Sequence, residues 1–158
     1  MKFSFFILLT FPIFLLQCSA DKDENLTSNC EVKSSSLKID GVGWSPCGGS
    51  FGTSQFPGGS TILNFTMNDA TTNTGTSHML VCNIYSYNGV GVYTTSLSNA
   101  VVGWQEFSDL NLVRVYFAQS GSLEIVEQDD KQIKVKINSI LTDSINDVSI
   151  VGEFELRN

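Results

Sequence analysis

The chain has 158 residues, 42% of them hydrophobic and 16% charged, with a formal net charge of −7 at pH 7. That length allows one domain with a substantial core behind a short leader. The acidic balance argues against binding nucleic acid or an anionic lipid surface through bulk charge.

The chain begins with the pattern of an export signal. Lys2 is followed by an apolar run from Phe3 to Leu16, and a polar segment starts after Cys18. A positive start, a short apolar stretch and an abrupt polar switch are typical of a secretory signal peptide. The run is shorter than the roughly twenty residues of a transmembrane helix. We therefore predict a signal peptide over residues 1–17.

One cleavage site makes Cys18 the acylated N-terminus of the mature chain. Leu15 and Ser19 suit a lipidated cysteine, whereas Gln17 stands where a smaller residue is usual. The polar run that follows favours this reading, because a lipid-anchored domain needs a flexible stalk. We therefore predict an acylated N-terminus and stalk over residues 18–35, with the membrane as partner through the lipid.

The alternative is an ordinary signal peptidase cut after Ala20, which leaves a secreted chain that begins at Asp21. Two N-glycosylation sequons, Asn25-Leu-Thr27 and Asn64-Phe-Thr66, would carry meaning in such a protein from a eukaryotic host. N-terminal mass analysis separates the two readings.

Three cysteines remain after Cys18, and an exported protein can form disulfides. The sequence favours a bridge between Cys47 and Cys82, both inside the expected domain, with Cys30 as an alternative partner for Cys47. The sequence predicts no metal site, because no C-x-x-C motif occurs and His78 is the only histidine. No cofactor is expected either.

Alternation of apolar and polar residues predicts strands through the rest of the chain. The expected strands lie at residues 36–40, 63–67, 79–87, 90–95, 113–117, 123–125, 133–137 and 150–156, with a further short one near Trp44. Glycine-rich stretches at 48–52 and 57–59 indicate loops, and Ser120-Gly121 indicates a turn. Residues 96–110 are expected to be irregular or to form a short turn of helix.

Short turns between successive strands favour antiparallel pairing. No amphipathic segment of helical length separates the strands, which disfavours a parallel sheet. About eight or nine strands in roughly 120 residues predict an all-β domain over residues 36–158, either an antiparallel β-sandwich or a flattened barrel.

Several stretches together resemble a family of small Bacteroidota lipoproteins that carry an all-β domain of unknown function. The resemblance rests on residues 37–45, with Ile39-Asp-Gly-Val-Gly-Trp44, on Gly91-Val-Tyr93, and on the closing stretches 120–130 and 148–154. Gly43 and residues 134–139 depart from the family pattern. The resemblance implies a lipid anchor at Cys18 and a sandwich-like domain, and it implies no defined activity.

The polar run after the leader adds to this resemblance. Asp21-Lys-Asp-Glu24 is similar to the short charged signals that send such lipoproteins to the outer surface. Relaxed acylation sites of this kind also resemble those of spirochaete lipoproteins. The implied location is a bacterial outer membrane or cell surface.

One stretch of the chain matches a catalytic motif. Gly48-Gly-Ser-Phe-Gly52 matches the G-x-S-x-G nucleophile elbow, which requires a strand before it and a helix after it. Pro46 and Pro57 flank the motif and His78 is the only candidate base, so we interpret it as a glycine turn.

The remaining candidates favour structural roles. The acid pairs Asp129 and Asp130, and Asp143 and Asp147, are interpreted as solvated turns. Six aromatic residues that could form a binding face are interpreted mainly as packing residues: Trp44, Tyr85, Tyr87, Tyr93, Trp104 and Tyr116.

Three functional readings remain. The sequence favours a non-enzymatic, lipid-anchored envelope protein whose β domain works in binding or interaction. A carrier of small hydrophobic ligands would need an unfilled interior, whereas large residues such as Phe65, Phe117 and Phe154 predict a filled one. The third reading is the secreted glycoprotein that begins at Asp21.

Overall fold

The computed structural model describes residues 32–55, 58–69 and 75–157. Within these ranges the chain forms strands and turns and no helix. The strands are β1 (Val32–Ser35), β2 (Lys38–Ile39), β3 (Val42–Gly43), β4 (Gly48–Gln55), β5 (Thr61–Asn68), β6 (Thr76–Ile84), β7 (Gly91–Thr94), β8 (Ala100–Ser108), β9 (Asn111–Gln128), β10 (Gln132–Thr142) and β11 (Asp147–Arg157). The predicted signal peptide and Cys18 lie outside the described residues.

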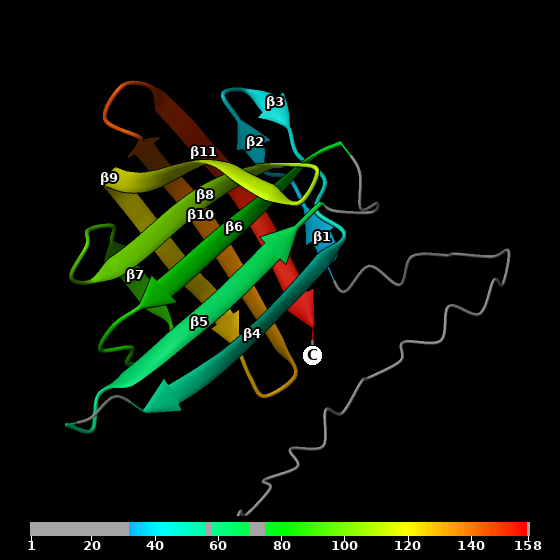
Figure 1. Ribbon diagram of the computed structural model, residues 1–158. Helices are drawn as coiled ribbons and strands as arrows, with labels where there is room; N and C mark the ends of the chain where they lie inside the picture. Colours follow the sequence, from blue (N-terminus) through cyan, green and yellow to red (C-terminus); the bar gives the residue numbers. More distant parts are fainter. Residues whose placement is uncertain (1–31, 56–57, 70–74, 158) are drawn as a thin grey trace, which may run out of the picture.

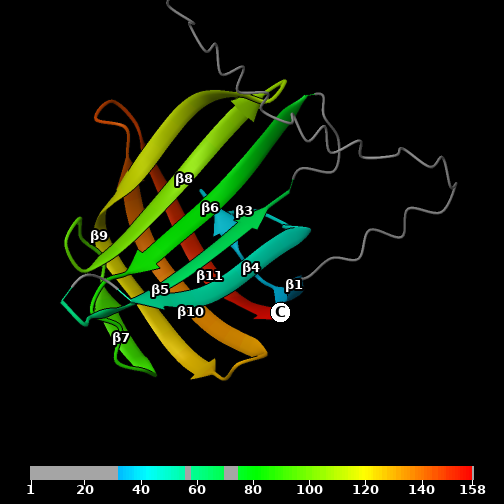
Figure 2. The ribbon, with the colours of Figure 1, turned by 60° about the horizontal axis from the view of Figure 1, so that its bottom comes forward.

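All eleven strands belong to one antiparallel sheet in the order β3-β2-β11-β10-β9-β8-β6-β5-β4, with β1 paired to β11 and β7 to β9. The sheet folds over on itself into two layers and does not close (Figures 1 and 2). The front layer holds β4, β5, β6, β8 and the first part of β9; the back layer holds the rest of β9 with β10, β11 and the short strands beside them. The predicted all-β sandwich or flattened barrel is confirmed.

Strand β9 belongs to both layers. Its first part pairs with β8 and its later part pairs with β7, while β10 runs along most of its length. Ile140 pairs with Ser120 and the next residue, Leu141, pairs with Ala118, so Gln119 is an extra residue in β9. Such a bulge bends a strand and raises its twist, which carries β9 from one layer into the other.

The predicted turn at Ser120-Gly121 is therefore wrong, because the chain continues as strand through both residues. Gly121 has a φ of +125°, and a Cβ there would lie 2.2 Å from the carbonyl oxygen of Asn138. The glycine marks a close approach of two backbones inside a strand instead of a chain reversal.

The core lies between the two layers, and its side chains meet there. The rings of Phe65 on β5 and Phe154 on β11 are 5.5 Å apart between centroids. Phe117 was expected in the core, but it is 48% exposed on the outer side of β9, and Tyr116 is buried instead. The other fully buried large side chains are Leu37, Leu63, Met67, Leu80, Ile84, Leu123, Ile125, Ile133, Leu141 and Ile150.

Two segments expected to be irregular or loops contain strands, which adds to the number of strands. Residues 96–110 contain β8, whose inward Ala100, Val102 and Trp104 alternate with outward residues that are also uncharged, so the alternation was hidden. Residues 48–52 belong to β4. A Cβ at Gly49 would lie 2.6 Å from a methyl of Leu156 on β11, so glycine allows β4 to pack closely against the back layer.

The folded domain also begins before residue 36, inside the segment predicted as stalk. Val32 on β1 pairs with Leu156, and the Lys33 ammonium lies 2.7 Å from the Glu155 carboxylate. The chain then passes over Gly152, where a Cβ would lie 2.6 Å from the Ser36 carbonyl oxygen, before β2 continues along the same edge. The first and last described strands are therefore neighbours.

Candidate functional site

The two cysteines expected to pair lie far apart. Cys47 and Cys82 are free thiols, which corrects the predicted disulfide. Cys82 pairs with Phe65, and Phe65 pairs with Phe51, four residues beyond Cys47 on β4. At about 3.3 Å per residue and about 4.8 Å per strand, the two Cα atoms are roughly 16 Å apart, beyond the roughly 7 Å that a disulfide spans. Cys30 lies outside the described residues.

The G-x-S-x-G motif does not bring its serine to the histidine. Ser50 points out from the front layer, where its hydroxyl lies 3.3 Å from that of Thr66. Thr66 pairs with Val81, and His78 is an odd number of residues from Val81, so its side chain lies on the opposite, inner face. The motif is an edge strand, and the glycine-turn reading is replaced.

Asp129, Asp130 and Asp143 sit at hairpin turns, as expected, whereas Asp147 is the first residue of β11. Asp129 accepts hydrogen bonds from the backbone N–H groups of Lys131 and Gln132 between β9 and β10. Asp143 does the same for Ile145 and Asn146 between β10 and β11. In the described ranges no three His, Cys, Asp or Glu side chains gather closely enough to hold a metal ion.

The aromatic residues are mainly packing residues. Trp44, Tyr93, Trp104 and Tyr116 are buried, whereas Tyr85 and Tyr87 are half-buried. Tyr93 donates to the carbonyl oxygen of Gly89 and so closes the loop before β7. None of the buried rings offers a face to a ligand from solvent.

A polar cluster that the sequence did not reveal surrounds Asp69, which follows β5. One carboxylate oxygen accepts hydrogen bonds from the Trp44 indole N–H and from His78 Nδ1, each at 2.7 Å. The other oxygen accepts the His78 backbone N–H at 2.6 Å. A carboxylate only accepts, so His78 Nδ1 is the donor of this hydrogen bond.

The side chains of this cluster pack against the ring of Trp104 in the core. The His78 ring stacks on Trp104, with centroids 5.1 Å apart and an angle of 17° between planes. The Trp44 ring meets Trp104 edge-on at 4.8 Å. Because Trp44 also donates its backbone N–H to Leu37 in the back-layer segment, it links the two layers.

The cluster continues along one end of the sandwich as a row of polar side chains. His78 pairs across the strands with Glu106, and Glu106 pairs with Arg114. Arg114 lies 3.5 Å from the Asp143 carboxylate and donates to the Tyr116 hydroxyl. We call Asp69, His78, Glu106, Arg114 and Asp143 the polar row.

The geometry of the polar row favours a structural role. Cys47, just before β4, donates its backbone N–H to the carbonyl oxygen of Asn68, whereas the His78 imidazole is bound to Asp69, and across the described residues no hydrogen bond joins the Cys47 thiol to the imidazole. A nucleophile needs the imidazole in the middle, where it can accept the proton of the thiol. The row instead connects β5, β6, β8, β9 and the β10–β11 turn by charged contacts around the aromatic layer.

The outer face of the front layer has a different character. Strand alternation and register place on it residues none of which carries a charge: Gly48, Ser50, Gly52, Ser54, Ile62, Asn64, Thr66, Asn68, Ser77, Met79, Val81, Asn83, Val101, Gly103, Gln105, Phe107, Leu112, Val115 and Phe117. We call this surface the neutral face.

The neutral face has a polar half and an apolar half. Strands β4 and β5 supply mainly hydroxyl and amide groups, whereas β6, β8 and β9 supply mainly aliphatic and phenyl groups. The ring of Phe117 lies beside Gly103, where a Cβ would be 3.7 Å from the ring. A hollow of about 280 Å³ at one end is lined by Asn68, Ser77, His78, Met79, Phe107 and Leu110.

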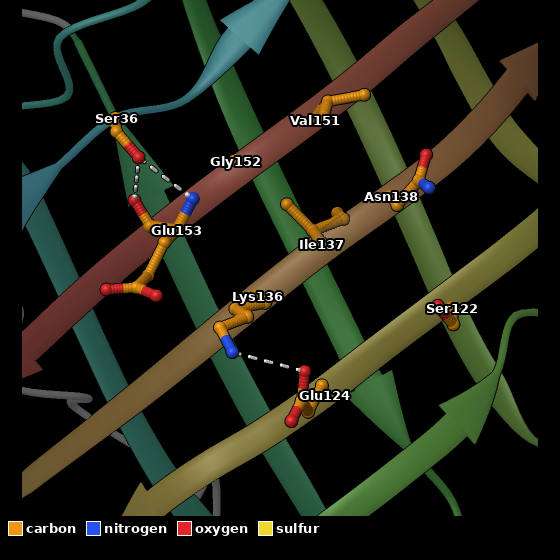
Figure 3. A pocket seen from close by; sticks show the side chains of 9 residues that line it. All are labelled: Ser36, Ser122, Glu124, Lys136, Ile137, Asn138, Val151, Gly152 and Glu153. Atoms are coloured by element: carbon orange, nitrogen blue, oxygen red, sulfur yellow. Dashed lines mark hydrogen bonds and ion pairs between the residues drawn. The ribbon is translucent and has the colours of Figure 1, made fainter.

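The outer face of the back layer is charged by comparison. A groove of about 370 Å³ lies across β9, β10 and β11. In it Lys136 points toward Glu124 (Figure 3), and the ammonium nitrogen lies 3.5 Å from the carboxylate. Beside it, Lys134 lies 2.7 Å from Glu153. The groove is therefore walled by charges that already have partners, and the neutral face is the candidate binding surface of the domain.

The contact between Asp69 and His78 could be inferred from the sequence only in part, and the neutral face could not. The lone His78 and Asp69 are nine positions apart, and they meet because β5 and β6 form a hairpin; that pairing could have been inferred from the two flanking strands. To recognise the neutral face from sequence, the register of five strands would have to be known, and no single stretch of sequence determines it.

Comparison with protein-family models, with curated proteins and with solved structures gave no match. The resemblance to Bacteroidota lipoproteins therefore stays a prediction. Across the described ranges, no helix has the length and hydrophobicity that a membrane crossing requires.

Proposed function

We propose that this protein is a lipid-anchored protein of a bacterial envelope whose β domain binds a partner through the neutral face. The observation that carries the proposal is the segregation of charge. A chain with a net charge of −7 leaves one whole sheet face without a charged side chain, and half of that face is apolar. Contiguous apolar surface on the outside of a domain is typical of interaction sites, and Leu112 and Phe117 are the most exposed apolar side chains of this face.

The position of β1 supports tethering that leaves this face accessible. Strand β1 pairs with β11 in the back layer, so the chain toward Cys18 joins the domain on the layer opposite the neutral face (Figure 1). An acyl group at Cys18 would then hold the domain at the membrane without covering its binding surface. The leader from Lys2 to Leu16 supplies the route of export.

The packed interior argues against the alternative of a hydrophobic-ligand carrier. Contact between Phe65 and Phe154 joins the two layers at the centre, and the inward residues around them are fully buried. A carrier needs a cavity that encloses its ligand. Binding through an outer face needs no such cavity.

Metabolic labelling with a fatty-acid analogue tests the anchor. The wild-type chain is expected to be labelled and to sediment with membranes, and Cys18→Ala is expected to lose both properties. Cys30→Ala is the matched control and should keep them. A Cys18→Ala chain that remains labelled and membrane-bound, or a wild-type mature N-terminus at Asp21, would overturn the anchored reading.

A further inference from the structure

Strands β1 and β4 begin close to each other, and a cysteine precedes each of them. Cys30 stands two residues before Val32, the start of β1, and Cys47 stands one residue before Gly48, the start of β4. We propose that Cys30 and Cys47 form a disulfide in the exported protein, which joins β1 to the front layer. The inference goes beyond the proposed function, since it needs export but neither the lipid nor the neutral face.

One leucine of the back layer lies against both segments. Leu156 on β11 pairs with Val32 on β1, so their Cα atoms are about 5 Å apart. A Cβ at Gly49 on β4 would lie 2.6 Å from a methyl group of Leu156, which places the Gly49 Cα within roughly 8 Å of the Leu156 Cα. Both views show β1 near the beginning of β4 (Figures 1 and 2). The first residues of the two strands are therefore neighbours across Leu156.

The remaining gap is short enough for a disulfide. By these contacts the Cα atoms of Val32 and Gly49 are at most roughly 13 Å apart, and two residues of chain span at most about 7 Å. Cys30 lies outside the described residues, so its position is bounded by this chain length alone. These limits allow the Cα atoms of Cys30 and Cys47 to approach to about 5.5–6 Å, the usual separation in a disulfide.

The other two cysteines are poor partners for Cys47. Cys82 is fully buried in the core, and its Cα lies roughly 16 Å from that of Cys47. Cys18 carries the acyl group on its sulfur in the proposed lipoprotein. Cys47 itself is only partly buried and its thiol is free, so an oxidant from solvent can reach it. Among the thiols of the mature chain, Cys30 is therefore the partner within reach.

The bond forms by exchange with an oxidant that itself carries a disulfide, such as a dithiol–disulfide oxidase of the envelope or oxidised glutathione. The thiolate of one cysteine attacks a sulfur of the oxidant, and a mixed disulfide forms as the first thiol leaves. The second cysteine attacks the mixed disulfide and releases the second thiol. The protein loses two electrons and two protons, which the oxidant takes up as its disulfide becomes two thiols. Compartments outside the cytosol supply such oxidants.

The bond strengthens the point where the tether enters the domain. Strand β1 has four residues, of which three are exposed, and it pairs with β11 alone. A pull on a membrane anchor acts on the first residue of β1 and separates β1 from β11 one residue at a time. A disulfide from Cys30 to Cys47 transfers that pull to β4, which pairs with β5 along its whole length.

Mass spectrometry tests the disulfide on a chain that begins at Ser19 and therefore carries Cys30, Cys47 and Cys82. The native chain is incubated with oxidised glutathione and then denatured with iodoacetamide. We expect one labelled thiol in the wild type and none in Cys82→Ala, with the other two cysteines paired in both. Cys30→Ser and Cys47→Ser, the matched controls, should gain the mass of one glutathione in place of the internal bond.

Thermal unfolding followed by circular dichroism gives a second measurement. The oxidised wild type should unfold about 5 to 10 °C above the reduced protein, because the closed loop restricts the unfolded chain. Cys30→Ser should have the same midpoint under both conditions. Iodoacetamide labelling of all three wild-type cysteines overturns the proposal, as does a bond through Cys82 or between two chains. Because this chain carries no lipid, none of these results bears on the labelling of Cys18, and failure of the disulfide is distinguished from failure of the anchor.

Discussion

The carboxylate of Asp69 and the indole nitrogen of Trp44 lie 2.7 Å apart, and this hydrogen bond fastens the segment before β4 to the end of β5. The same carboxylate also holds His78 by its backbone and by its ring. One side chain therefore connects three segments at the end of the sandwich. The Asp69 side chain is only 21% exposed, so if it were removed, water could not easily take its place as hydrogen-bond acceptor.

Asp69→Ala should lower the free energy of unfolding by about 2 kcal/mol or more, because it leaves three donors without their acceptor. Trp44→Phe keeps a ring against Trp104 and removes only the N–H, so a loss of about 1 kcal/mol is expected. Urea unfolding followed by tryptophan fluorescence in Asp69→Ala, and by circular dichroism in both variants, measures the changes. Asp130→Ala, at an exposed turn, is the control, and a loss of equal size there would contradict the assignment.

Gly121→Ala should be among the most destabilising small substitutions in the chain. Its Cβ would lie 2.2 Å from the Asn138 carbonyl oxygen at a φ of +125°, so the backbone of β9 or β10 must move, at a cost of about 3 kcal/mol or more. The measurement is the midpoint of thermal unfolding. Gly43→Ala, which meets no atom within 4 Å, should change it little. Equal midpoints for the two variants would show that β9 does not need this glycine.

Thiol labelling distinguishes the two described cysteines. Burial raises the pKa of the Cys82 thiol well above its usual value, and a buried protonated thiol is a poor nucleophile. In a chain that begins at Ser19 and carries Cys30→Ser, we expect iodoacetamide to modify Cys47 in the native protein and Cys82 only after denaturation. Mass spectrometry reads both. A mass two daltons lower with no modified thiol would restore the disulfide that the sequence suggested.

Because of Asp143, the free energy of unfolding of the domain should depend on pH in the acid range. Hydrogen bonds from the backbone of Asn146 and then of Ile145, with a smaller effect of Arg114, hold the pKa of its carboxyl below the usual value. The stabilisation is therefore present above the pKa of the unfolded chain and is lost as the pH falls through the lower folded value.

We expect Asp143→Asn to be less stable than wild type at neutral pH and to differ less from it as the solution is acidified. Nuclear magnetic resonance titration of the wild-type carboxyl carbon measures the pKa directly, and urea unfolding at several pH values measures the stability. Asp130→Asn provides the control at a neighbouring turn. A carboxyl that titrates at or above its usual value would refute the expectation.

The sequence was sufficient for the fold class wherever alternation was clean. Residues 133–137 and 150–156 alternate in the sequence and do so in β10 and β11, because one side of each strand faces the core and the other faces water. The pattern failed where both sides of a strand carry uncharged residues, as in the first half of β8, since Val101 and Gly103 point outward from the same strand as Val102 and Trp104 point inward. It also failed at Gly121, where close packing of backbones needs the residue that usually signals a turn.

The candidate site was less accessible to sequence reasoning for a related reason. Its composition is ordinary in every strand, and only the register of several strands collects the uncharged residues on one face. The polar row was hidden in the same way, because Asp69, Glu106 and Arg114 are distant in sequence. A local sequence pattern predicts one strand at a time, whereas the neutral face and the polar row are each formed by several strands paired in a particular register.

The pairing of β1 and β2 with β11 has a consequence for how the protein is made. The first described residues find their neighbours only when the last eleven-residue strand has been synthesised. Such a fold has a high contact order and forms slowly. A stop codon before Asp147 would therefore leave β10 without its neighbour and β1 and β2 without a strand to pair with, and the shortened chain should be unfolded by circular dichroism.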